Sequence, residues 1–426
     1  MNRWIHSSHR RTIAPMLTFH RASFAAALAA TSALFVINAC SSDSENSWTP
    51  SAGGTAHGGA AGQAGTAGAA GQSGQAGTAG AAGQSGQAGS AGASTGGASN
   101  ECGGADLTSD PKNCGTCGHD CDGGACKSGV CQGVVLVSGQ RIARSLVQDA
   151  TSLYWIVSPS STDSGIMKVA KSGGTPEWLV PVQSQFLWGM AVANGELYYA
   201  ASEAKPDGAI MKVPVSGGTP VAVVTGRDYP ASVAVDSTAV YWSEGMPGWA
   251  LATAPLAGGS AVLLAQSEGG DYRNARAIAV DSSGLFWTVS KSDPSVKEAA
   301  VMKSGLQAGP ATSLVSGLLE PWGILLNASV VYWTDVSDNT VSKVPSSGGD
   351  VVVLATGENA TDLAIQGDSI YWGNSSAIRK MPVSGGTPVS IVAGQTNPGW
   401  VNVDDASVYW IDNPTPETGK IVRSPR

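Results

Sequence analysis

The chain has 426 residues, long enough for one large domain or two ordinary ones, and its 56 glycines with only 13% charged residues are unusual for a single globule. The formal net charge is −8, and no long run of lysine or arginine supplies the counter-charge that phosphates need, which argues against nucleic acid as a partner. No cysteine follows Cys131 and no histidine follows His119. The chain therefore divides into segments of different composition.

Residues 1–40 have the pattern of an export signal. A basic stretch precedes an apolar run from Phe24 to Ile37, which is shorter than the roughly 20 residues of a membrane-spanning helix. The run ends at Ile37-Asn38-Ala39-Cys40, which resembles a bacterial lipobox. The resemblance implies lipid on Cys40 and an exported protein of the bacterial cell envelope, expected in the outer membrane, with a membrane contact through the lipid anchor only. Cleavage without lipidation, giving a secreted protein, is the alternative.

Residues 41–100 are predicted to be a disordered linker of Gly, Ala, Ser and Gln. Glycine falls at every third position from Gly59 to Ser94, which is a feature of collagen, but this stretch has no proline to hold a collagen chain extended. It also lacks apolar residues large enough to build a core. We therefore expect a solvated tether.

Residues 101–132 contain six cysteines, so many in so short an exported segment that three disulfides are expected. The cysteines are Cys102, Cys114, Cys117, Cys121, Cys126 and Cys131. Zinc binding through Cys114-Gly-Thr-Cys117 is the weaker alternative, because the other spacings form no second matching pair. The run from Asp110 to Cys121 resembles the module named after plant stigma-specific proteins, which implies a small disulfide-rich module and no known chemistry.

Residues 134–426 contain seven copies of a motif in which an aliphatic residue precedes two aromatic residues. The copies are Leu153-Tyr154-Trp155, Leu197-Tyr198-Tyr199, Val240-Tyr241-Trp242, Leu285-Phe286-Trp287, Val331-Tyr332-Trp333, Ile370-Tyr371-Trp372 and Val408-Tyr409-Trp410. They recur every 38 to 46 residues, the period of a small antiparallel unit in a radial array. Such a motif suits a strand buried on both faces, with wide rings filling the gap to the next unit.

Around each copy the sequence predicts four short strands. In the third copy these are Ser232–Asp236, Val240–Ser243, Leu251–Pro255 and Ala261–Leu264, separated by turn residues. Third-strand copies such as Ile210–Val213 alternate apolar with polar residues, so we expect them to be partly solvated.

The last repeat lacks a fourth strand, and Val134–Val137 matches the missing one. The N-terminal strand is therefore predicted to close the ring of an all-β, seven-bladed β-propeller. The region 134–426 resembles propellers with YWTD-type repeats and the related NHL and TolB-like groups, on the full match at Val331–Asp335. Because YWTD propellers usually have six blades, six blades is the alternative.

The propeller region has neither histidine nor cysteine, which excludes Ser-His-Asp and Cys-His nucleophile systems there, histidine metal sites, and the histidine-dependent lyases that share this fold. Asp236, Asp281 and Asp404 each end a first strand, so we expect them to hydrogen-bond the following turn. No cofactor is predicted. Structural calcium at Asp404-Asp405 or at Asp335–Asn339 stays open, although neither has the spacing of a known calcium loop.

The second-to-third loops are long and unequal, and in a propeller they open on the same end as the crossings between blades. Variable loops on a rigid scaffold are where binding usually occurs, and aromatic and arginine side chains around a central mouth suit a sugar or peptide. The crossings carry Arg144, Trp188, Tyr229, Arg276, Trp322, Asp362 and Trp400 just before the inner strands. The alternative is that Trp188, Trp322 and Trp400 plug the channel as core.

Two classes of function follow. The favoured one is a surface-anchored, non-catalytic binding or scaffold lipoprotein that recognises a protein, a glycan or an envelope component. The alternative is a propeller hydrolase or lyase that uses carboxylates and a bound divalent metal.

Overall fold

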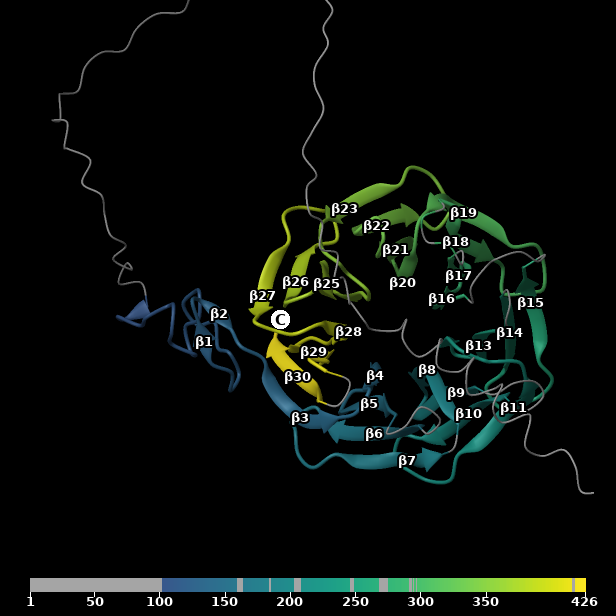
Figure 1. Cartoon of the computed structure of the whole chain (residues 1–426), viewed down its shortest axis with the longest axis horizontal. Coiled ribbons are helices and arrows are strands. Elements are labelled where there is room, and N and C mark those ends of the chain that lie inside the picture. Colours follow the sequence, from purple (N-terminus) through teal and green to yellow (C-terminus); the bar gives the residue numbers. More distant parts are fainter. Residues whose placement is uncertain are drawn as a thin grey trace, which may run out of the picture. The chain divides into compact units, whose positions relative to one another are not determined.

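The computed structural model describes residues 102–158, 164–183, 185–202, 208–245, 249–267, 275–290, 293, 295, 297–415 and 418–426. The predicted signal, Cys40 and the linker lie outside these residues. Thirty β-strands and no α-helix occur in the described part, and in it no helix of a length and apolarity to span a membrane is found. Seven four-stranded antiparallel sheets surround a central axis (Figure 1). The prediction of a seven-bladed propeller is confirmed, and the six-bladed alternative is wrong.

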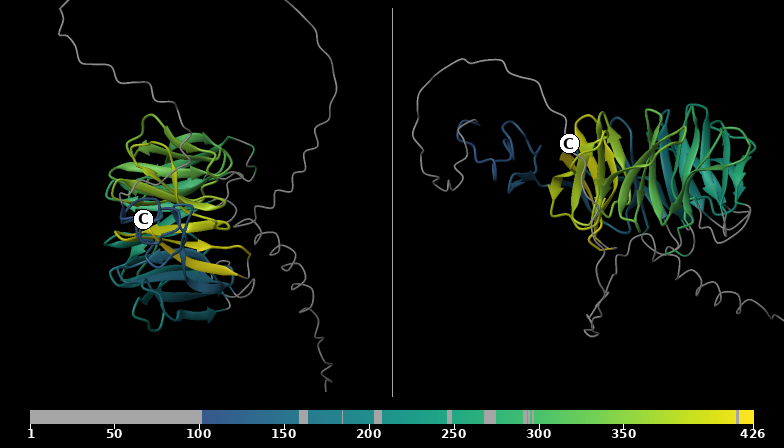
Figure 2. Two further views of the ribbon diagram at one scale, coloured as in Figure 1. Left: turned by 90° about the vertical axis from the view of Figure 1, so that its left-hand side faces the viewer. Right: turned by 90° about the horizontal axis from the view of Figure 1, so that it is seen from above.

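Four strands build each blade from the axis outward, and Figure 2 shows them running between the two ends of the ring. The inner strands are β4 (Arg144–Gln148), β8 (Phe186–Ala193), β12 (Val233–Val235), β16 (Ile278–Asp281), β20 (Pro321–Asn327), β24 (Ala364–Gln366) and β28 (Pro398–Val403). The second strands, which carry the aromatic motif, are β5 (Ser152–Val157), β9 (Glu196–Ser202), β13 (Ala239–Glu244), β17 (Gly284–Val289), β21 (Val330–Asp335), β25 (Ser369–Gly373) and β29 (Ser407–Asp412).

The third strands are β6 (Ser164–Ala170), β10 (Gly208–Pro214), β14 (Ala250–Pro255), β18 (Ala299–Ser304), β22 (Thr340–Pro345), β26 (Ala377–Pro382) and β30 (Gly419–Pro425). The outer strands are β7 (Glu177–Gln183), β11 (Val221–Arg227), β15 (Val262–Gln266), β19 (Thr312–Leu318), β23 (Val352–Thr356), β27 (Val389–Ala393) and β3 (Val134–Gln140).

The ring closes as predicted. The last sheet has the order β28-β29-β30-β3, so the N-terminal strand β3 is hydrogen-bonded to the C-terminal strand β30. In that pairing Val135 lies opposite Val422 and Val137 lies opposite Ile421. Closure by strands from both ends of the propeller removes the open gap that the seventh blade would otherwise have.

The two aromatic residues of each motif face opposite neighbouring blades, which explains why both are required. Trp155 shares a buried cluster with Tyr409 of the preceding blade, whereas Tyr154 shares one with Tyr199 of the following blade. The same arrangement pairs Tyr198 with Trp242, Tyr241 with Trp287, Phe286 with Trp333, Tyr332 with Trp372, and Tyr371 with Trp410. Each such ring buries about 150–250 Å², a gross gain of about 4–6 kcal/mol at about 25 cal/mol per Å².

The polar residues of the third strands are partly solvated, as expected, and their side chains also make contacts that the sequence did not predict. The ammonium groups of four lysines cross to the next blade and donate hydrogen bonds to its backbone carbonyls. The pairs are Lys168 with Val215 at 2.9 Å, Lys212 with Leu256 at 3.0 Å, Lys303 with Ser346 at 2.6 Å, and Lys343 with Val383 at 2.7 Å. These side chains are partly buried, so the lysine repeat links blades to one another.

The turns after the inner strands are fixed by carboxylates, as expected. Asp236 accepts hydrogen bonds from the backbone N–H groups of Thr238 and Ala239 and from the Tyr241 hydroxyl. Asp281 and Asp404 make the corresponding bonds to their own turns. The aromatic motif and the aspartate turn therefore stabilise each other within a blade.

The cysteine-rich segment carries two short strands, β1 (Cys126–Lys127) and β2 (Val130–Cys131). The expected three disulfides are present and join Cys102 to Cys117, Cys114 to Cys126, and Cys121 to Cys131. All six cysteines are thereby used, which leaves no thiolate for the zinc alternative. The segment contacts the closing blade through an ion pair of 2.9 Å between Arg423 and Asp122.

Candidate functional site

One end of the ring carries the crossings between blades, and we call it the mouth. Every inner strand runs away from this end, because it directly follows the crossing from the preceding blade. The second strands run toward it, so the loops to the third strands also open there. Residues 159–163, 203–207, 246–248, 268–274 and 416–417 of these loops and crossings lie outside the described residues. The predicted site residues are therefore described, while part of their surroundings is not.

Four of the predicted site residues occupy the same structural position. Arg144, Trp188, Arg276 and Trp322 each lie three residues before the inner-strand residue that pairs with the first aromatic of the motif. Asp362 and Trp400 lie one position further on, and Tyr229 precedes β12. Arg144, Trp188, Trp322 and Trp400 lie within inner strands, at irregular register positions, and not before the strands as predicted.

Two arginines stack on the tryptophans of the next blades. The Arg144 guanidinium lies 5.1 Å from the centre of the Trp188 ring and 5.3 Å from that of Phe186. The Arg276 guanidinium lies 4.2 Å from the centre of the Trp322 ring. Such contacts hold a cation over the electron-rich ring face. The structure thus brings together two pairs of the predicted residues, each across a blade boundary.

The two arginines differ in their electrostatic environment. Arg276 forms an ion pair of 3.3 Å with Glu320. Arg144 is only 9% exposed, and its hydrogen bonds go to neutral groups, the Leu187 carbonyl at 3.0 Å and the Ser164 hydroxyl at 3.5 Å. Loss of water around the guanidinium lowers the pKa of Arg144 to about 10.

The aromatic residues of the mouth differ in accessibility. Trp188 is 37% exposed and Tyr229 is 39% exposed. Trp400 is partly buried and packs against the cluster that contains Leu146 and Trp155. The ring of Trp188 is stacked on Phe186, with centres 5.9 Å apart. Trp188 and Tyr229 therefore present accessible rings, while Trp400 belongs in part to the core.

Two aromatic residues of the mouth have unfavourable backbone conformations. The φ angles of Tyr229 and Trp400 are +48° and +49°, in the left-handed region that bulky residues rarely adopt. Each such residue costs on the order of 1–3 kcal/mol, and strain of this kind is concentrated at binding sites.

Asp362 links two blades at the mouth. Its carboxylate accepts hydrogen bonds from the backbone N–H of Leu363, at 2.9 Å, and from that of Val401 in the next blade. The burial of the carboxyl raises its pKa to about 6, because the two hydrogen bonds offset only part of the lost hydration. Gly323 lies directly alongside, since a Cβ there would come within 3.1 Å of the Asp362 Cα.

Hydroxyl groups also tie the blades together at the mouth, and sequence reasoning missed them. The Thr288 hydroxyl donates to the Trp322 carbonyl at 2.8 Å, and the Thr334 hydroxyl donates to the Thr361 carbonyl at 3.3 Å. Ser243 makes a similar bond of 3.0 Å to the Ala275 carbonyl. All three directly follow the tryptophan of the motif, which is the signal that could have revealed them.

The carboxylates considered for calcium have other partners. The oxygens of Asp335 accept hydrogen bonds from the backbone N–H groups of Leu319, Glu320 and Asp338. Asp404 accepts hydrogen bonds from the Lys171 ammonium and the Tyr409 hydroxyl, in addition to those from the backbone of its turn. Among the described residues, the one group of three or more potential metal ligands within reach of one another is Cys114, Cys121 and Cys131, which are disulfide-bonded.

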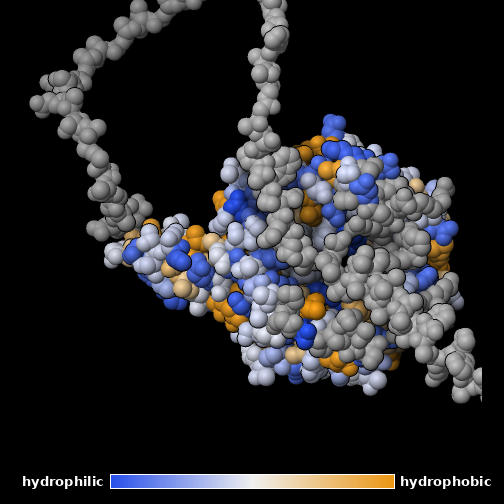
Figure 3. Space-filling view, in the orientation of Figure 1, coloured by the Kyte–Doolittle hydropathy of each residue, from blue (hydrophilic) through white to orange (hydrophobic). Residues whose placement is uncertain are grey.

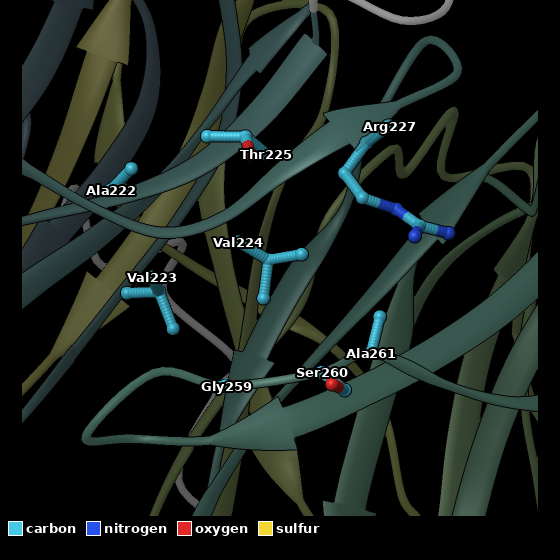
Figure 4. Close-up of a pocket in the computed structure, with 8 residues that line it drawn as sticks. All are labelled: Ala222, Val223, Val224, Thr225, Arg227, Gly259, Ser260 and Ala261. Carbon is cyan, nitrogen blue, oxygen red and sulfur yellow. The ribbon is translucent and has the colours of Figure 1, made fainter.

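A shallow cavity of about 440 Å³ lies away from the mouth, between the second and third blades (Figure 4). It is lined by β11 and by the turn at Gly259–Ala261. The Arg227 guanidinium at its edge is paired with Glu244 and is not available to a ligand. Apolar side chains also reach the surface at the rim (Figure 3), including Val221 and Val262 on outer strands. The one charged side chain that lines the cavity is already paired, so the mouth is the better candidate.

No protein-family model matches this sequence, and no curated protein does. Several solved structures are similar to it. Virginiamycin B lyase from Staphylococcus aureus aligns at 12% identity and a TM-score of 0.54, covering 68% of this chain and 98% of that one. A streptogramin B lyase aligns at 12% identity and a TM-score of 0.54, covering 69% and 97%. The nidogen/laminin complex aligns at 19% identity with a TM-score of only 0.39, covering 51% and 84%. The chain is a β-propeller repeat protein, and at these identities the likeness shows the fold alone.

Proposed function

We propose that this chain is an exported, non-catalytic binding or scaffold lipoprotein, which recognises a protein, a glycan or another cell-envelope component at the mouth of its propeller. The observation that carries the proposal is the combination of accessible rings at Trp188 and Tyr229 with a stacked arginine at one end of a rigid ring. Wide aromatic faces beside a few fixed polar groups are what ligand sites are built from. The strained backbone at Tyr229 and Trp400 also favours the mouth as the binding site.

Binding is preferred to catalysis because of the residues that the propeller offers. It contains no histidine and no cysteine, so it lacks the usual general bases and nucleophiles. The alternative, a hydrolase or lyase with carboxylates and a divalent metal, needs several carboxylates close together. In the described part of the propeller, no such group is found.

The N-terminal segments support an anchored arrangement. Lipid on Cys40 would hold the chain at a membrane surface, and the linker at 41–100 would separate the propeller from it. A flexible linker of some 50 residues spans about 40 Å root-mean-square. The disulfide-rich module at 101–132 would then join the tether to the closing blade of the propeller at 134–426.

Oxidative footprinting tests the mouth even while the ligand is unidentified. The full chain is exposed to hydroxyl radicals with and without an extract of bacterial envelope, and the oxidation of each tryptophan and tyrosine is measured by mass spectrometry. We expect protection of Trp188 and Tyr229, with Trp178 as the internal control, because it is 47% exposed and lies on the outer strand β7, away from the axis of the ring. Protection of Trp178 with Trp188 unchanged would refute the proposal.

A further inference from the structure

Arg144 is a buried cation for which the described residues supply no anion. Its guanidinium lies against the stacked pair of Phe186 and Trp188, and its two hydrogen bonds come from Nη2 alone. The Nε atom is buried with no hydrogen-bond partner, as is that of Arg276, so the two arginines differ in their counter-charge and not in this atom. Ring faces and neutral oxygens offset only part of the hydration that a buried charge loses.

Arg276 provides a comparison, because its charge is compensated within the protein. It occupies the same position three blades further on and stacks on the corresponding tryptophan in the same way, at 4.2 Å. There the chain itself supplies the counter-charge, through Glu320 at 3.3 Å. A partly buried arginine paired with a carboxylate is the arrangement expected for such a side chain. Arg144 has the same ring contact, but no described residue supplies it with an acid.

We infer that the missing counter-charge is supplied by the ligand, and that Arg144 and Trp188 together form a subsite for the carboxylate of an acidic sugar. The inference rests on the proposed function and deepens it by naming a ligand class. Trp188 is 37% exposed, so a sugar ring can lie on its accessible part while the carboxylate reaches the guanidinium. Tyr229, before the inner strand of the next blade, is also exposed, at 39%. The exposed ring of Trp188 beside the guanidinium favours a sugar, whose flat face can stack on it, over an acidic peptide.

Calorimetric titration of the full chain at low salt tests the inference with three probes. The first is tri-galacturonate, the second is its methyl ester, in which the same sugars carry no charge, and the third is a tri-glutamate peptide. We expect tri-galacturonate to bind and the methyl ester to bind more weakly by a factor of about 30 or more, which is the effect of removing one partner from a buried charge pair. The Arg144→Gln variant should lose the same factor for tri-galacturonate.

Arg423→Gln is the charge-matched control, because Arg423 pairs with Asp122 away from the mouth, and tri-galacturonate should bind it as it binds the wild type. Stability provides a second readout. In buffer without carboxylates, Arg144→Gln should unfold at the wild-type temperature or above it, since it removes an uncompensated charge. Added tri-galacturonate should raise the unfolding temperature of the wild type only. Should Arg144→Gln fail to fold, the comparison of tri-galacturonate with its ester on the wild type still decides the question.

Three results would overturn the inference. Equal binding of tri-galacturonate and its methyl ester would mean that the carboxylate charge does not contribute to binding. Unchanged affinity of Arg144→Gln would place the charge contact elsewhere, and binding of tri-glutamate in place of the sugar would make the ligand an acidic peptide. In each case protection of Trp188 in the footprinting experiment would leave the proposed binding function standing.

Discussion

The residues of the mouth combine three features that a purely structural channel lining does not need. Arg144 is charged and buried, Trp188 is apolar and exposed, and Asp362 is held partly buried against its preference for water. Each arrangement costs free energy in the isolated protein. A ligand that supplies an anion, covers a ring or exchanges a proton would recover part of that cost.

Asp362 makes the stability of the propeller depend on pH. Its pKa of about 6 in the folded chain lies above the ordinary value of 3.8, so the folded state holds this proton more tightly than the unfolded state does. Its contribution to stability is full below about pH 4 and is lost as the pH rises through 6. At neutral pH the buried charge costs on the order of 1–3 kcal/mol, at about 1.4 kcal/mol per pKa unit.

Asp362→Asn should therefore stabilise the protein at pH 7.5 and change little at pH 4, because asparagine can still accept both backbone hydrogen bonds. Thermal unfolding of the variant and the wild type at the two pH values checks this. Asp350→Asn, in an exposed turn after β22, is the control and should show no such difference between pH values. Equal destabilisation of Asp362→Asn at both pH values would contradict the account.

Thr288 tests the hydroxyl contacts between blades. Its side chain is fully buried, and it donates to the Trp322 carbonyl at 2.8 Å. Thr288→Val keeps the shape and leaves that carbonyl without its donor, at a cost of about 1–3 kcal/mol. Denaturant unfolding measures the loss. Thr253→Val, which removes a bond to Val240 within a single blade, is the comparison, and the smaller loss is expected there because Thr253 is only partly buried.

At the scale of the elements, the closing strand β3 carries more of the stability than its seven residues suggest. It completes the seventh sheet, and Val137 is buried in the cluster with Trp155 and Tyr409. Without it, β30 would expose an unpaired edge and the two ends of the propeller would no longer be joined.

Deletion of Val134–Ser138 should lower the unfolding temperature far more than deletion of residues 52–100, which contain no large apolar residues to bury. Differential scanning calorimetry of the two deletion variants gives the comparison. Equal shifts for both deletions would show that closure by β3 is not what holds the ring together.

The sequence predicts the elements well because their signals are local. The aromatic motif marks the second strand of each blade, and the aspartates mark the turns after the inner strands. The missing fourth strand of the last blade could be matched to Val134–Val137 by pattern alone. The lysine contacts could not be predicted, because a lysine on β22 reaches a carbonyl such as Val383 only through the register between two blades.

The same limit applies to the candidate site. The sequence could place Arg144 and Arg276 at equivalent positions, since the repeat pattern puts both near the start of an inner strand. It could not predict that Glu320 pairs with one of them while the other has neutral partners, because this depends on side chains brought in by the following blades. The pKa of Asp362 depends likewise on Val401 of the next blade and on the packing around it.

At the scale of the whole molecule, the chain combines a predicted tether, a disulfide-rich module and a closed ring. The module depends on its three bridges, because so short a segment cannot bury a sufficient core. Intact mass with and without reductant should differ by about six protons, and digestion should recover the pairs Cys102–Cys117, Cys114–Cys126 and Cys121–Cys131. Free thiols among these six before reduction, or zinc at one equivalent, would disprove the disulfide framework.

The most direct test of the central claim, that the mouth binds the ligand, is the retention of envelope components on the immobilised full chain, compared between two tryptophan variants. Trp188→Ala and Trp178→Ala each remove one exposed ring from the first two blades, the former at the mouth and the latter on the outer strand β7. With both variants folded, we predict that Trp188→Ala loses at least about tenfold in retention, as for a central aromatic contact, while Trp178→Ala retains as much as the wild type. Full retention by Trp188→Ala with loss in Trp178→Ala would move the binding surface to the rim and contradict the account.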